Sequence, residues 1–94
     1  SLLQNKLEEL SKELSEKLVK SQLRCKTISL KLRLSDFTTF TRQMTFESHT
    51  DNQQMLSDAA RELLKREITP DTQFRLIGLG VSGLKEHFQL PLFD

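Results

Sequence analysis

The sequence predicts an α+β domain in which two amphipathic helices cover one face of a small antiparallel sheet. Three observations support this fold class. Residues 2–20 and 52–67 repeat apolar side chains at helical spacing, residues 26–34 alternate strictly between apolar and polar, and a short connection follows that strand. A chain of 94 residues is long enough for one small domain, so helices and sheet should share a single core.

The first segment, residues 2–20, is predicted to be a helix. A coiled coil would need a longer stripe than this one, which lasts under three heptads, and no second helix directly follows. We therefore favour a helix that packs on a sheet. The stripe recurs at spacings of four and three and consists of Leu3, Leu7, Leu10, Leu14 and Leu18.

Residues 26–34 form the first predicted strand. Its apolar parity is Ile28, Leu30, Leu32 and Leu34, and its polar parity is Thr27, Ser29, Lys31 and Arg33. A solvated sheet face is the ordinary explanation for such a polar parity, but the two cations also make it a candidate binding surface. Ser35 and Asp36 make a turn, so residues 37–46 should return as the second strand of an antiparallel hairpin.

The second strand has one ambiguous residue. Arg42 falls on the apolar parity, where either a bulge re-aims it or its aliphatic stem reaches along the sheet edge. The remaining apolar residues of this strand are Phe40, Met44 and Phe46, and the polar parity is Thr39, Thr41, Gln43 and Thr45.

A second helix is predicted over residues 52–67, with Asp51 or Thr50 as its N-cap and Thr69-Pro70-Asp71 after its end. Its apolar side consists of Met55, Leu56, Ala59, Ala60, Leu63 and Leu64. Residues 73–82 form a third strand. Alternation places Ile77, Leu79 and Val81 on one face and Leu76, Gly78, Gly80 and Ser82 on the other. The two glycines either leave open backbone for a ligand or mark a bulge.

Composition narrows the function classes. No apolar run approaches the ~20 residues that span a bilayer, so we expect no membrane association. The single cysteine, Cys25, fits a reducing cytoplasm, and with only His49 and His87 beside it we expect no metal site. No nucleophile–base pair or phosphate loop favours a stand-alone enzyme. Basic residues gather in segment 20–46 and acidic residues in segment 47–72, although the net charge is only +1.

Several short segments, taken in order, resemble the C-terminal little finger domain of Y-family DNA polymerases, of the bacterial DNA polymerase IV type. These segments are residues 27–33, Ser35-Asp36-Phe37, residues 41–46, residues 60–64 and residues 75–79. The resemblance covers about residues 5–94. It implies the family's β-α-β-β-α-β fold with the first edge strand absent here, a domain over residues 1–84 and a tail over 85–94. The chain begins at Ser1 without Met, which also indicates a fragment.

The resemblance implies that the parent protein is an error-prone translesion polymerase and that its magnesium ions lie in an absent palm domain. This fragment should therefore hold no catalytic residue and no cofactor. Its sheet should hold the backbone of duplex primer–template DNA without sequence preference. Arg75 matches a family arginine, although alternation alone places it on the opposite face. Relatives often have a basic residue where this chain has Leu76 or Gly80. The implied DNA-binding residues are Ser29, Lys31, Arg33, Thr39, Thr41, Arg42, Gln43, Thr45, Arg75, Gly78, Gly80 and Ser82.

The C-terminal segment Gln89-Leu90-Pro91-Leu92-Phe93 is apolar, and Pro91 favours an extended chain. An extended apolar peptide is typical of a ligand for a groove on another protein, or it folds back on its own domain. It resembles the bacterial sliding-clamp-binding motif, which implies that Gln89, Leu90, Leu92 and Phe93 bind the clamp. An uncovered sheet edge would also allow two copies to pair. The alternative function is a generic split-βαβ interaction or RNA-binding module, which often stacks bases on aromatics of the open sheet face.

Overall fold

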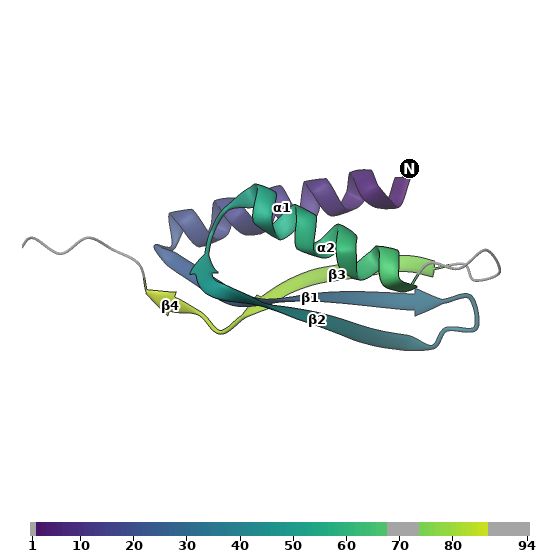
Figure 1. Cartoon of the computed structure of the whole chain (residues 1–94). Coiled ribbons are helices and arrows are strands. Elements are labelled where there is room, and N and C mark those ends of the chain that lie inside the picture. The colour runs from purple at the N-terminus through teal and green to yellow at the C-terminus, as the bar shows by residue number, and fades with distance from the viewer. Residues whose placement is uncertain (1, 68–73, 87–94) are drawn as a thin grey trace, which may run out of the picture.

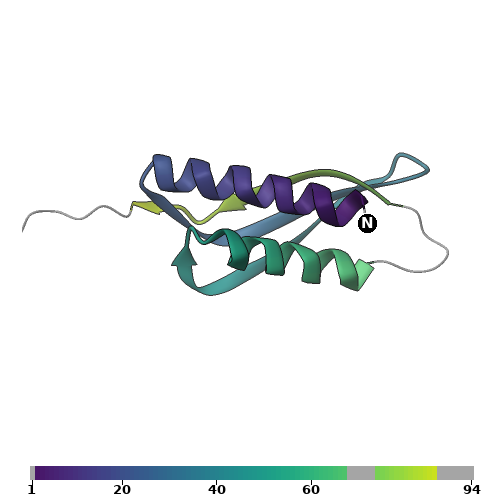
Figure 2. The same ribbon diagram turned by 90° about the horizontal axis from the view of Figure 1, so that it is seen from above.

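The computed structural model describes residues 2–67 and 74–86, and it has two layers: helices above and a sheet below (Figure 1). The elements are α1 (Leu2–Lys20), β1 (Leu23–Leu34), β2 (Thr39–Thr50), α2 (Gln53–Glu67), β3 (Phe74–Ser82) and the short β4 (Lys85–Glu86). The α+β fold class, with two helices and a small antiparallel sheet, is confirmed. Both helices lie on the same side of the sheet and run in opposite directions beside each other (Figure 2).

The strand order is β2-β1-β3, with β1 in the centre, and both of its long pairings are antiparallel. β4 pairs with the start of β1, at Leu23 and Arg24. This pairing keeps the β1–β3 register: Thr27 opposes Ser82 and Arg24 opposes Lys85, so β4 continues β3 beyond Gly83. Lys85 and Glu86, the first two residues of the predicted tail, thus pair with β1.

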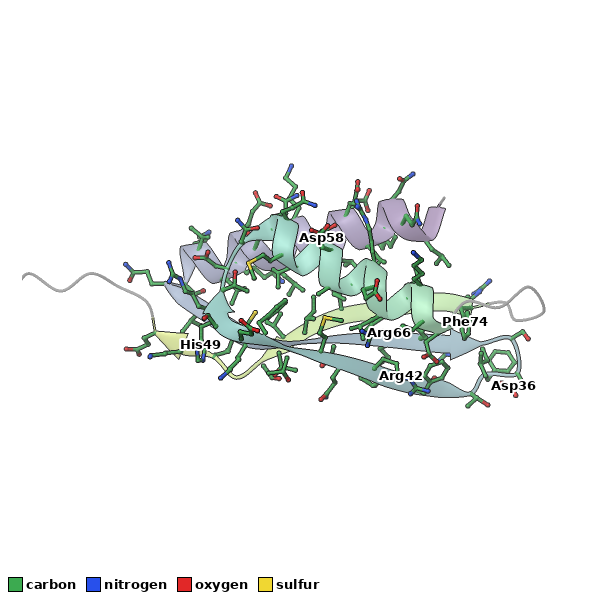
Figure 3. The ribbon with its side chains drawn as sticks, viewed as in Figure 1. Asp36, Arg42, His49, Asp58, Arg66 and Phe74 are labelled. Carbon is green, nitrogen blue, oxygen red and sulfur yellow. The ribbon has the colours of Figure 1, made fainter. Side chains whose placement is uncertain are left out.

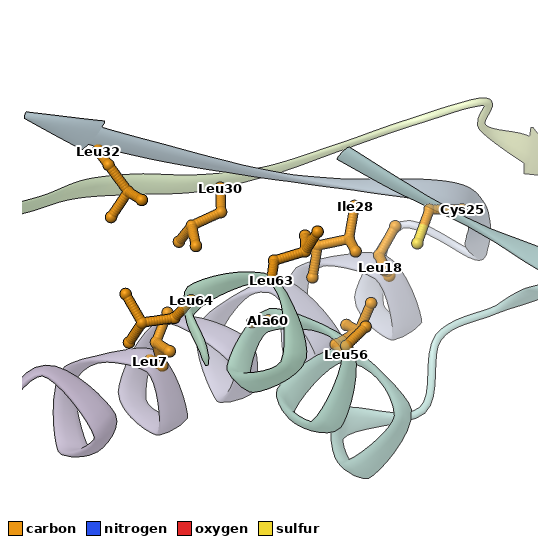
Figure 4. Packing of buried hydrophobic residues seen from close by; sticks show 11 residues of the cluster. Leu7, Leu18, Cys25, Ile28, Leu30, Leu32, Leu56, Ala60, Leu63 and Leu64 are labelled. Carbon is orange, nitrogen blue, oxygen red and sulfur yellow. The ribbon is translucent and has the colours of Figure 1, made fainter. Parts of the chain in front are cut away.

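The core lies between the helices and the sheet (Figure 4). Ile28, Leu30 and Leu32 of β1 are fully buried, as the alternation predicts. They face Leu7 and Leu18 of α1 and the apolar side of α2, which buries Leu56, Ala59, Ala60, Leu63 and Leu64. Met55 was assigned to that apolar side, but it is 44% exposed and instead accepts a hydrogen bond from the Thr50 hydroxyl at 3.4 Å.

The helix layer shows why α1 does not need an unbroken leucine stripe. Ser11 and Ser15 are buried beside the leucines, and small side chains allow α1 and α2 to approach closely. The Ser15 hydroxyl donates to the Asp51 carbonyl at 2.6 Å, and Arg61 of α2 pairs with Glu8 of α1. These contacts join the two helices to each other and to the end of β2.

The cap of α2 corrects one expectation. Asn52, not Asp51 or Thr50, is the N-cap, because its Oδ1 accepts the Met55 backbone N–H at 2.9 Å. Thr50 acts one step earlier: its hydroxyl accepts the Asn52 backbone N–H at 3.0 Å. The predicted end of this helix at Thr69-Pro70-Asp71 lies outside the described residues.

β2 continues to Thr50, four residues beyond the predicted end of the strand, and β1 begins at Leu23. The extension is possible because the β1–β2 register shifts between Cys25 and Thr27. Cys25 and its partner Thr50 are both buried, although Cys25 has the parity of the polar residues. A bulge thus turns the apolar side of the strand end back toward the helices.

Candidate nucleic-acid interface

The open face is the sheet surface that points away from α1 and α2. The strand registers assign its residues in rows of three, one from each of β2, β1 and β3. Residues directly opposite each other in an antiparallel pair have side chains on the same face, so each row can be read as neighbours. The rows are Thr39–Arg33–Arg75, Thr41–Lys31–Gly78, Gln43–Ser29–Gly80 and Thr45–Thr27–Ser82.

A bulge in β3 decides where Arg75 lies. Lys31 pairs with Gly78, but Leu32 pairs with Leu76, so Ile77 is an extra residue in β3. The extra residue reverses the alternation between the two halves of the strand. Arg75 therefore opposes Arg33 on the open face, whereas uninterrupted alternation had placed it on the helix side. Phe74 opposes Leu34 and packs against the core.

The open face gathers cations at one end. Lys31, Arg33 and Arg75 are exposed, and none of the ion pairs among the described residues involves them. The four rows contain no Asp or Glu. Acidic side chains instead occur in the ion pairs of the helix layer, where Glu8, Glu9, Glu62 and Glu67 are found. The near-neutral net charge thus hides a domain with a basic face and a mixed-charge face.

A shallow depression of about 300 Å³ lies in the middle of the open face. A Cβ added at Gly78 or Gly80 would meet no atom within 4 Å, so the backbone of β3 is uncovered there. Bare backbone beside a lysine and hydroxyl groups suits an anionic group that accepts hydrogen bonds, such as a phosphate. The depression is lined by Ser29, Lys31, Thr41, Gly78, Leu79 and Gly80.

Arg42 does not belong to this face. The β1–β2 register is regular from Thr27 to Arg33, so no bulge re-aims it. Its guanidinium lies 4.4 Å from the Phe40 ring centroid and 3.4 Å from Glu67 Oε1 at the end of α2. Figure 3 shows Arg42 on β2, near the end of α2. Its stem therefore runs along the sheet edge on the helix side, and its predicted DNA contact stays a prediction.

The interior strand aromatics lie on the helix side as well. Phe40 and Phe46 are half-buried against the core, and the Phe40 ring meets Phe74 edge-on with centroids 5.9 Å apart. No aromatic residue occurs in the four rows of the open face. Base stacking on the sheet surface, the hallmark of the alternative RNA-binding module, therefore has no support among these residues.

The tail residues Gln89, Leu90, Leu92 and Phe93 lie outside the described residues. Within the described ranges, no group of three or more His, Cys, Asp or Glu side chains is arranged to hold a metal ion. Neither described helix is long and apolar enough to cross a membrane.

Comparison with known proteins agrees with this geometry. Residues 1–92 match the family model described as the impB/mucB/samB family C-terminal domain. The chain is 40% identical over 84 residues to a DNA polymerase IV of Listeria monocytogenes, which covers 89% of this chain and 24% of that protein. It is 41% identical over 76 residues to a DNA polymerase IV of Lactococcus lactis, covering 79% of this chain and 21% of that protein.

The chain thus spans about a quarter of the length of these relatives. The family match extends over nearly every residue of the chain. This chain belongs to the impB/mucB/samB family, as a C-terminal domain of that family.

Proposed function

We propose that this domain holds duplex DNA for an error-prone translesion DNA polymerase of the DNA polymerase IV kind. In this proposal the domain is the family's little finger, and it acts in the cytoplasm as part of a longer polymerase that carries the catalytic carboxylates and magnesium elsewhere. The observation that carries the proposal is the acid-free open face, on which Lys31, Arg33 and Arg75 gather at one end.

The chemistry of the face fits DNA backbone and not base edges. Cations neutralise phosphates, and hydroxyl and amide groups donate hydrogen bonds to phosphate oxygens. The rows supply both kinds, with cations at one end and uncharged polar groups at the other. A sheet carrying these groups recognises the shape and charge of a duplex, so affinity should depend little on base sequence. The polar contacts we assign to it are Ser29, Thr39, Thr41, Gln43, Thr45 and Ser82, with backbone approach at Gly78 and Gly80.

The test is a salt titration of binding to a labelled duplex of about two helical turns, in two unrelated base sequences. Three phosphates neutralised by three cations would give a slope of log K against log salt of about −2.7. Equal affinity for both sequences and a clear negative slope support the proposal. A domain that binds neither duplex at low salt, or binds one sequence far more tightly, contradicts it.

We further propose that the tail, residues 85–94, binds the bacterial sliding clamp through Gln89, Leu90, Leu92 and Phe93. A tethered peptide raises the local concentration of a weakly binding domain at the primer end without new contacts to DNA. Capture of purified clamp by the chain should be lost when Leu92 and Phe93 are both changed to Ala. Clamp capture that survives this double substitution contradicts the tail assignment and leaves the DNA proposal intact.

The edges of the sheet are a candidate surface for pairing between two copies of the chain. β2 and β3 are the outer strands of the described sheet, and an unpaired strand edge can accept a second chain. We propose edge-to-edge pairing of two copies in this fragment, which sedimentation over a concentration series tests. A monomer at all concentrations contradicts it.

A further inference from the structure

The β1–β2 hairpin ends in a three-residue loop, Ser35-Asp36-Phe37, that hydrogen bonds hold closed. The Phe37 N–H donates to the Leu34 carbonyl at 3.0 Å, and the Leu34 N–H donates to the Thr38 carbonyl at 2.8 Å. The Thr38 N–H donates to Asp36 Oδ1 at 2.9 Å, which lowers the pKa of the Asp36 carboxyl. These bonds define one conformation for the loop and hold Phe37 in it.

Phe37 occupies the one position of this loop that normally requires glycine. A three-residue hairpin loop of this kind places its last residue in the left-handed region, and Phe37 has a φ of 72° there. A bulky side chain in that region is strained, because its Cβ crowds the backbone. Position 37 thus carries a phenyl group although its backbone conformation favours glycine or asparagine.

The phenyl group of Phe37 is also not stabilised by burial. It is 78% exposed, the largest exposed fraction among the large apolar side chains described, and it is not among the residues that pack against the core. Strain and exposure together indicate that the ring is retained for a contact with another molecule.

The position of the loop identifies the chemistry of that molecule. Only Leu34, Ser35 and Asp36 separate Phe37 from Arg33, whose row also contains Arg75 and Thr39. Figure 3 shows Asp36 of this loop at the end of the molecule that carries Phe74, far from His49. Phe37 therefore lies in the loop beside the cationic end of the open face. A basic surface with an exposed aromatic ring beside it is the usual arrangement for binding a nucleic-acid strand and stacking a base.

We propose that Phe37 stacks on an unpaired nucleobase of a DNA strand whose duplex part lies on the open face. This rests on the proposed function and names its substrate class: duplex with a single-stranded extension, in preference to blunt duplex. Phe has no polar group, so its contribution is stacking, which tolerates every base. A base that is already unpaired can stack without the cost of leaving a duplex, whereas a wedge within the duplex must first unstack it.

Phe37→Gly is an informative substitution, because it removes the ring and relieves the strained backbone at once. The melting temperature should stay equal or rise, so a loss of binding cannot be attributed to unfolding. Phe37→Tyr keeps an aromatic ring and should preserve binding. Val19→Ala is the matched control, since Val19 is another exposed apolar residue but belongs to α1.

The measurement compares blunt duplex with the same duplex extended by unpaired bases at either the 5′ or the 3′ end. For at least one extension we expect the unchanged chain and the Tyr and Val19 variants to bind roughly 5- to 100-fold more tightly than blunt duplex, and Phe37→Gly to lose that preference. An extension that adds no affinity, or a preference that survives Phe37→Gly, overturns the inference and leaves contact with another protein surface as the explanation for the ring. If blunt duplex binds with the expected salt slope in that case, the proposed function still stands.

Discussion

Arg33 of β1 and Arg75 of β3 lie directly opposite each other in the antiparallel ladder, two cations on the same face with no acidic partner among the residues that the structure describes. Like charges at opposite positions destabilise a sheet, so this pair is costly for folding alone. The bulge at Ile77 creates the pair, because without it the Arg75 side chain would point toward the helices. A phosphate group between the two guanidinium groups would turn the repulsion into attraction.

Replacing both arginines should therefore separate folding from binding. Arg33→Gln with Arg75→Gln is expected to leave the free energy of unfolding unchanged or to raise it by about a few tenths of a kcal/mol. The salt slope for duplex DNA should become shallower by about 0.9 for each arginine. Lys65→Gln is the control for each single arginine change, since it removes one positive charge from an exposed position on α2. A slope that changes equally in the control would mean that total charge, not this face, drives binding.

The glycines of the depression allow a second test that separates stability from DNA binding. Valine at position 78 would meet open space, and strands favour valine over glycine, so Gly78→Val should raise the free energy of unfolding by about 0.5–1 kcal/mol. The branched side chain would nevertheless fill the depression and keep a phosphate from the backbone of β3. Chemical denaturation should therefore show a higher free energy of unfolding for Gly78→Val, whereas its affinity for duplex DNA should be lower.

Gly83→Val provides the contrast. Gly83 has a φ of 64°, and a Cβ there would lie 3.2 Å from Lys26 Cβ. This substitution should lower the free energy of unfolding by at least about 1–2 kcal/mol, because the left-handed backbone is strained for valine. Equal stability effects at positions 78 and 83 would contradict the description of the depression as open space.

Arg42 should contribute to the stability of the domain and not to DNA binding. Its ion pair with Glu67 is partly exposed, and its guanidinium lies over the Phe40 ring on an exposed strand, so together the two contacts contribute about 1 kcal/mol. Arg42→Gln should lower the free energy of unfolding by roughly that amount and leave the salt slope for duplex DNA unchanged. A slope reduced as much as by Arg75→Gln would return Arg42 to the DNA-binding set.

Periodicity in the sequence was enough to predict the elements, because each helix and strand carries its own repeat. The predicted helix over residues 2–20 matches α1, and the predicted strands overlap β1, β2 and β3. Phe40 and Met44 also pack toward the core as their parity predicts. These features are local, since a strand exposes or buries alternate residues whichever strand lies beside it.

The errors concern relations between strands. The bulge at Ile77 is visible only against the register of β1, and within β3 the alternation looks unbroken, so alternation alone puts Arg75 on the wrong face although the resemblance includes it among the DNA-binding residues. The burial of Cys25 likewise depends on a relation between strands, the register shift against β2. Phe37 follows from both levels: its place near a strand end sets it apart from the core aromatics in the sequence, but its positive φ and its exposure are seen only in the fold.

The buried thiol gives the last prediction, on pH. Burial raises the pKa of Cys25 above its ordinary value of 9.0, and the nearby Asp51 carboxylate raises it further, while a backbone hydrogen bond lowers it in part. In the unfolded chain the thiol ionises first, so the unfolded state binds fewer protons than the folded state once the pH passes about 9.0. The free energy of unfolding should be insensitive to this group below that pH and should fall as the pH rises above it.

Urea denaturation between neutral pH and pH above 9.0 measures the effect, and Cys25→Ala should flatten this part of the profile even though it lowers stability at every pH. A profile that falls with the same slope in Cys25→Ala would assign the alkaline loss to other groups, such as the lysines.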